Sequence, residues 1–228
     1  VGRQRLVTNC GVPVAHAGPL RRLSRTTAAH STVSINDTSS CRFLNRSWMG
    51  DWLGEAIIAG PTRVLSERRR ENGATALIMG HNGYVDRYAI VHERRLSLTD
   101  AGDRLDGIDS FLTPAGQPIS RSGKDLFAIR FHLHPGVQAS QSGSGRIVTL
   151  TLPDGETWEF HTDGPEVEIE DSILMSNTRG NRKSIQMVIH GIAQLTPHVA
   201  WMMHRTAVGG RRRPASPADR RAGAPSRG

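Results

Sequence analysis

The 228-residue sequence has few aromatic residues, few cysteines and no long apolar run. Aromatic side chains make up 5% of the chain, and the only cysteines are Cys10 and Cys41. Two cysteines allow a single disulfide but no disulfide framework, and without a Cys-x-x-Cys pair a cysteine zinc site is not indicated. No stretch approaches the roughly 18 consecutive apolar residues that cross a bilayer, so no membrane span is predicted.

The motifs of several large enzyme classes are also missing. Glycines occur singly at turn positions, so the sequence has no phosphate-binding loop, no dinucleotide fingerprint and no nucleophile elbow. The aspartates and glutamates are scattered, and their spacing does not place any pair together. Local motifs therefore do not assign a reaction.

The formal net charge of +8 is unevenly distributed. Residues 207–228 hold six arginines and one aspartate, a charge of +5, which leaves +3 for residues 1–206. A mildly basic body does not require a nucleic-acid-binding face, so no nucleic-acid partner is predicted. The end segment is rich in Arg, Pro, Ala, Ser and Gly, and we predict that it is a disordered tail.

The chain opens on Val-Gly-Arg-Gln-Arg, without an initiator Met or the apolar region of a signal peptide. We expect that an upstream segment was removed or that the chain belongs to a longer protein. No export signal is visible.

Short β-like runs recur roughly every 8–12 residues with turn signals between them, as in an antiparallel sandwich or barrel. Hairpin turns are predicted at Asn72-Gly73, at Asn82-Gly83 and at residues 153–156. The best helical candidate is residues 48–59. The pattern predicts a single all-β domain over residues 1–206.

Histidine and tryptophan supply the candidate site residues. His30 precedes a predicted strand and is read either as a hydrogen-bonded structural residue or as a metal ligand. His132 and His134 share one strand face, where a polar cross-strand arrangement is favoured over a metal pair. Trp48 and Trp52, four residues apart, either stack on a sugar or anchor their loop on the sandwich.

Four segments in order resemble the C-terminal domain of the bacterial heparinase II/III-like family. They are residues 6–11 (LVTNCG), 26–33 (TTAAHSTV), 81–84 (HNGY) and 127–137 (FAIRFHLHPGV). The resemblance covers nearly all of residues 3–206. It implies a large antiparallel β-sandwich of the supersandwich type, following an N-terminal α/α toroid that this chain lacks.

The resemblance also implies a polysaccharide lyase that cleaves uronic-acid-containing chains by β-elimination, in the periplasm or cell envelope. In that reaction a base removes the C5 proton, polar donors neutralise the uronate carboxylate, and an acid protonates the leaving oxygen. The main Tyr, His and Asn of the family lie largely on the toroid. We therefore expect this chain to be inactive alone.

In relatives the β domain holds zinc, and the matching positions here are His30 and Asn9. An aspartate ligand of the family is replaced by Asn9, a poorer zinc ligand, and a further ligand segment would precede Val1. The resemblance thus implies zinc in the full-length parent, while we expect none in this chain.

Two hypotheses follow. The first is the β-sandwich of a lyase, with acidic polysaccharide and the missing toroid as partners. The second is a non-catalytic sandwich that binds acidic polysaccharide or packs on a partner domain, with Trp48, Trp52 and the tail as contacts. A domain separated from its toroid should expose an apolar patch where the toroid packed, and we predict this patch at Leu6, Val7, Trp48 and Trp52.

Overall fold

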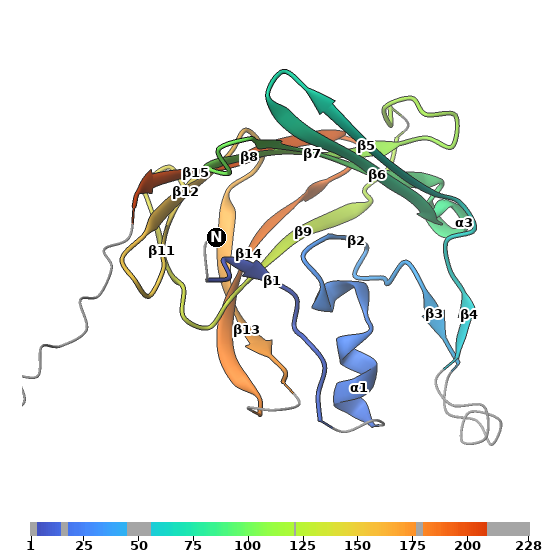
Figure 1. Ribbon diagram of the computed structural model, residues 1–228. Helices are drawn as coiled ribbons and strands as arrows, with labels where there is room; N and C mark the ends of the chain where they lie inside the picture. The colour runs from blue at the N-terminus through green and yellow to red at the C-terminus, as the bar shows by residue number, and fades with distance from the viewer. Residues whose placement is uncertain (1–3, 15–17, 45–55, 121, 177–179, 209–228) are drawn as a thin grey trace, which may run out of the picture.

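The computed structural model describes residues 4–14, 18–44, 56–120, 122–176 and 180–208. These residues form two antiparallel sheets that face each other, as the sequence predicts (Figure 1). No helix within the described ranges is long and apolar enough to cross a membrane. Trp48 and Trp52 lie outside these ranges, as does nearly all of the predicted tail.

The larger sheet has eight strands. In spatial order they are β10 (Gln138–Gln141), β11 (Ile147–Thr151), β12 (Thr157–Thr162), β15 (His198–Ala207), β8 (Arg104–Leu112), β7 (Ile90–Thr99), β6 (Ala74–Tyr84) and β5 (Val64–Glu71). Most neighbours in this sheet are also neighbours in sequence. Local hairpins therefore build most of the sheet.

The smaller sheet is assembled from distant segments. Its order is β1 (Val7–Thr8), β9 (Leu126–Leu133), β14 (Arg182–Ile192) and β13 (Val167–Leu174), and β2 (Val33–Ile35) also pairs with β9. β1 and β2 follow each other along one edge of β9, because β14 takes the other edge. The N-terminal segment is thereby placed directly beside the central strand.

The remaining elements are short. They are the hairpin β3 (Arg42–Phe43) and β4 (Ile57–Ala59), the helices α1 (Pro19–Ser24) and α3 (Val85–Tyr88), and the 3-10 turn η1 (Thr27–Ala29). Figure 1 shows α1 below β2, beside the smaller sheet.

The core lies between the sheets and is aromatic at its centre. Phe131 of β9 packs edge-on against Trp201 of β15, with ring centroids 4.8 Å apart. Phe127 of β9 stacks on Phe111 of β8, with ring centroids 4.6 Å apart. Strand β9 is buried on both faces, since Ala128 and His132, which alternate with these rings, are also shielded from solvent. A polar residue on β9 must therefore find its partners inside the protein.

Two predicted hairpins are confirmed and one is wrong. Asn72 and Gly73 both have positive φ between β5 and β6, as a tight hairpin turn requires. Residues 153–156 likewise join β11 to β12. Asn82 and Gly83 instead belong to β6, because the Asn82 carboxamide oxygen accepts hydrogen bonds from the backbone N–H groups of Thr62 and Arg63.

The helix prediction over residues 48–59 is wrong where it can be examined, because Ile57–Ala59 form β4. Helix α1 was not predicted from the sequence. Its first residue is Pro19, whose fixed φ suits the first turn of a helix.

The predicted apolar patch is also wrong in its described part. Leu6 is buried and Val7 packs against the core, because β1 pairs with β9 as an outer strand of the smaller sheet. Exposed apolar side chains lie elsewhere, for example at Ile57 and Ile58 of β4 and at Val64 and Leu65 of β5.

Candidate functional site

The segment after η1 brings the predicted residues Asn9 and His30 together. Ser31, next to His30, donates its backbone N–H to the Asn9 carboxamide oxygen at 2.9 Å. The Ser31 hydroxyl donates to the Thr8 carbonyl and accepts the backbone N–H of His132. One serine thus holds β1, β9 and the His30 loop in a fixed arrangement.

The ring of His30 is oriented by the backbone. Its Nδ1 lies 2.9 Å from the Thr26 carbonyl oxygen, and because a carbonyl can only accept, Nδ1 carries the proton. In the neutral ring the free lone pair is then on Nε2. His30 is half-buried, so this nitrogen can serve as a base or as a ligand.

The described residues do not complete a zinc site at His30. A protein zinc site needs three or four donors, preferably imidazole, thiolate or carboxylate. Here Asn9 offers only a neutral amide oxygen, and that oxygen already accepts the Ser31 N–H. The donors present do not fit zinc by themselves, and the role of His30 and Asn9 as ligands stays a prediction.

A second cluster, not found by sequence reasoning, lies on the same face of the smaller sheet. His132 of β9 donates Nε2–H to the Ala28 carbonyl at 2.9 Å. Its Nδ1 therefore accepts, and the Ser172 hydroxyl of β13 donates to it at 2.9 Å. Burial lowers the pKa of His132, which keeps the ring neutral and this orientation intact.

The Cys10 thiol completes this cluster. Its Sγ lies 3.5 Å from Nδ1 of His132 and 4.0 Å from the Ser172 hydroxyl. Burial raises the pKa of the Cys10 thiol, so it stays protonated and is a poor nucleophile. Positions 10, 132 and 172 share no local spacing, and nothing in the sequence pattern connects them.

The histidines of the His-x-His pair have separate roles. The His134 Nδ1 accepts the backbone N–H of Gly136 in the turn that ends β9. Burial lowers the pKa of His134, and the positive charges of Arg182 and Arg5 lower it further. Among the described residues the pair joins no group of metal-ligating side chains.

An open groove of about 480 Å³ runs beside this cluster. Its lining includes Arg130 of β9, Gln186 of β14 and, from the cluster, Cys10, His132 and Ser172. The Gln186 side chain donates to Glu170, and within the described residues its buried carboxamide oxygen has no partner. A cation and an unpaired acceptor suit a ligand with acidic and hydroxyl groups.

A buried ionic network contacts the loop that carries His30. Asp109 of β8 accepts bonds from His92, from two nitrogens of Arg94 and from the Trp201 indole, at 2.7–3.0 Å. Arg94 also donates to the Ser31 carbonyl at 2.7 Å. The larger sheet is thereby connected to the loop that carries His30.

Comparisons with known proteins agree with this architecture. Residues 1–202 match the family profile described as "Heparinase II/III-like, C-terminal". Over 200 residues the chain is 32% identical to FtsZ-localized protein C of Caulobacter vibrioides, covering 86% of this chain and 34% of that protein.

Solved lyase structures share the fold. The chain superposes on the heparan sulfate lyase HepC of Pedobacter heparinus with a TM-score of 0.66 and 14% identity, over 91% of this chain and 29% of that one. A heparinase III superposes with a TM-score of 0.64 and 14% identity, over 90% and 28%. The chain therefore spans about a third or less of these relatives.

Proposed function

Because this chain belongs to the heparinase II/III-like C-terminal family, we propose that it is the β-sandwich module of a lyase for uronic-acid-containing polysaccharide. The match over residues 1–202 carries this proposal. We further propose that the protein works in the periplasm or cell envelope, with acidic polysaccharide and an N-terminal α/α toroid as partners.

The residues of the groove support binding better than cleavage. β-Elimination needs a base near C5, donors that neutralise the uronate carboxylate, and an acid for the leaving oxygen. Arg130 lines the groove and can pair with a carboxylate, although it also donates to the Ser34 hydroxyl. His30 offers a lone pair on Nε2 but lies outside the groove lining. His132 cannot act as the base while Ser172 occupies its lone pair and the ring is buried.

The described groove lining offers no tyrosine as the acid, and its one carboxylic residue is Asp171, which is exposed. The chain has two tyrosines. Tyr84 is buried and donates its hydroxyl to the Val33 carbonyl, while the Tyr88 hydroxyl is bonded to Thr38. Neither tyrosine lines the groove. We infer that the acid comes from the toroid and that this module contributes binding and His30.

This inference predicts that the chain alone forms no unsaturated product from heparin, heparan sulfate or a polyuronate. Ultraviolet absorbance of the product measures the reaction. The full-length protein should be active, and there His30→Ala should lower kcat by about 100-fold if Nε2 is the base. Robust product from the chain alone would contradict the need for a toroid.

The same preparations can be applied to a heparin column. We expect salt-dependent retention that decreases when residues 207–228 are deleted, since that segment holds most of the net positive charge. Unchanged retention after the deletion would remove the tail from the proposal.

The 32% identity to FtsZ-localized protein C favours a second candidate function. In this alternative the sandwich is a non-catalytic module that brings its protein to FtsZ. A fluorescent fusion of the full-length protein should then colocalise with FtsZ, and heparin and heparan sulfate should neither bind nor react. Diffuse or envelope-wide fluorescence together with lyase activity would favour the first function.

A further inference from the structure

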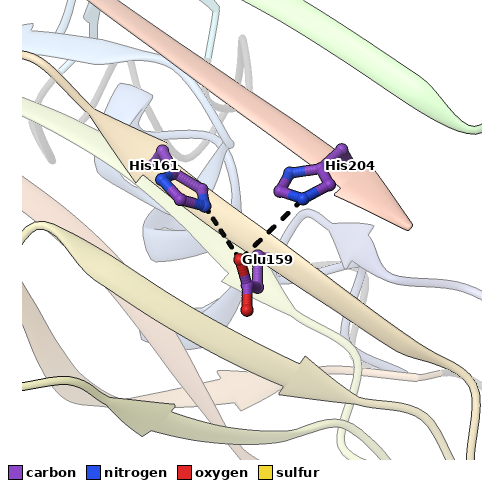
Figure 2. A group of neighbouring side chains, drawn as sticks. All are labelled: Glu159, His161 and His204. Atoms are coloured by element: carbon purple, nitrogen blue, oxygen red, sulfur yellow. Dashed lines mark hydrogen bonds and ion pairs between the residues drawn. The ribbon is translucent and has the colours of Figure 1, made fainter. Parts of the chain in front are cut away.

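The outer face of the larger sheet carries a group of metal-ligating side chains far in sequence from His30. Glu159 and His161 come from β12, and His204 comes from β15 (Figure 2). None of these three residues was predicted from the sequence to belong to a site. The inference drawn from them does not rest on the proposed lyase function.

Strand periodicity and register explain why these side chains meet. Glu159 and His161 are two residues apart on β12, so both point outward while Phe160 between them points into the core. In the antiparallel pairing of β12 with β15, Glu159 lies directly opposite His204. Directly opposed residues have neighbouring Cβ atoms, which brings the third side chain to the first two.

The distances match those of a metal site. Nε2 of His161 lies 3.0 Å from Oε2 of Glu159, and Nε2 of His204 lies 3.8 Å from the same oxygen. All three ligand atoms lie within 4.8 Å of one another. Zinc–ligand bonds of about 2.0–2.1 Å place tetrahedral ligands about 3.3 Å apart, so small rotations of the side chains suffice.

Burial and charge also favour a cation here. The three side chains are 30–34% exposed, which is open enough for entry and shielded enough to strengthen the charge of Glu159. Across the sheet, the cation Arg104 lies opposite His204. Its guanidinium is paired with Asp106 through both Nε and NH2, so its repulsion of a metal ion is reduced.

We propose that Glu159, His161 and His204 form a binding site for a divalent transition-metal ion, with Zn²⁺ as the best match. Two imidazoles and one carboxylate leave the fourth position for water or a ligand. An open groove of about 410 Å³, lined in part by His161, Asp163 and Asp106, adjoins this position.

The other candidate cluster fits less well. Glu168, Glu170 and His190 on β13 and β14 also lie close together, but Glu168 and His190 are exposed. Glu170 is further occupied by a hydrogen bond from Gln186 at 2.7 Å. His190 therefore provides a matched control, an imidazole beside a carboxylate that should not hold the metal.

The environment of His204 sets the expected affinity. Ligation through Nε2 leaves the ring proton on Nδ1, and this buried nitrogen has no partner among the described residues. A hydrogen-bond partner on the nitrogen that does not bind the metal typically raises metal affinity by about 10–100-fold. We therefore expect this site to bind metal more weakly, by that factor, than a site in which both imidazoles have such a partner.

The test uses the full chain without an affinity tag, stripped of metal and titrated with ZnCl₂ in a calorimeter. We expect one equivalent to bind, and His161→Ala or His204→Ala to weaken binding at least 10-fold. Glu159→Gln keeps the shape and should weaken it similarly, which guards against misfolding of the alanine variants. His190→Ala and His30→Ala should leave binding unchanged.

Cobalt provides a second readout of the ligands. Co²⁺ in the same site should give intense tetrahedral absorption bands that vanish in His204→Ala and persist in His190→Ala. The proposal is overturned if the wild-type chain binds no zinc, or if folded variants of Glu159, His161 and His204 bind as tightly as the wild type. Loss of binding in His30→Ala alone would assign the metal to the other site.

Discussion

Replacement of Asp109 by asparagine is expected to lower the free energy of unfolding by about 3–5 kcal/mol, because it leaves a buried charge unpaired. Asp109 is completely buried, and its carboxylate is the partner of Arg94, His92 and Trp201. An amide would present N–H groups to these donors, and Arg94 would keep its charge over the rings of Phe131 and Trp201. Urea denaturation followed by tryptophan fluorescence measures the loss.

Asp106→Asn is the matched control on the same strand. Asp106 points outward and pairs with Arg104 where both side chains are about half exposed, so we expect a loss of at most about 1 kcal/mol. Equal effects of the two substitutions would show that the buried network does not stabilise the sandwich.

The pH dependence of stability provides an independent test of Asp109. Burial alone would raise the pKa of this carboxyl, but the charge of Arg94 and the His92 hydrogen bond more than offset that effect and lower it. A lowered folded-state pKa contributes stability above the unfolded pKa of about 3.9 and loses it as the pH falls toward the folded value. The difference in free energy of unfolding between the wild type and Asp109→Asn should therefore become smaller in acid.

His132→Ala is expected to cost about 2–4 kcal/mol, because it empties a buried site and leaves the Ala28 carbonyl without its donor. It should also expose Cys10, whose thiol packs against the missing ring. Maleimide labelling, carried out in a Cys41→Ser background, should be slow in the parent and much faster in the variant.

Ser172→Ala separates the hydrogen bond from the packing at this site. It removes only the hydroxyl that donates to Nδ1, so we expect a cost of about 1 kcal/mol and little change in labelling. If His132→Ala were as stable as Ser172→Ala, the ring would not connect β9 to its neighbours as described.

Local sequence patterns predicted those parts of the fold that local geometry controls. Asn72-Gly73 and residues 153–156 specify turns whose backbone angles are set within a few residues, and both hairpins form there. Asn82-Gly83 has the same pattern but stays in β6, because Asn82 caps a loop contributed by residues 62 and 63. A long-range contact overrides the local preference in that case.

The candidate site was likewise predicted from the sequence only in part. The resemblance of residues 6–11 and 26–33 to the family identified Asn9 and His30, and Ser31 does connect them. The cluster of Cys10, His132 and Ser172 combines β9, β13 and the segment after β1, and its members are 40 to 162 positions apart. No periodicity within one segment can report such a meeting.

The sequence alone determined the all-β class, two hairpins of the larger sheet and the family, because these depend on alternation, turn residues and motif order over short spans. Only the tertiary structure decided which polar residues are buried and which share a surface. Strand order and register place His204 of β15 opposite Glu159 of β12, two strands that are distant in the chain, and place Asp109 opposite Arg94 in the hairpin of β7 and β8. The few aromatic residues fill the space between the sheets, and the polar clusters that remain are where function is expected.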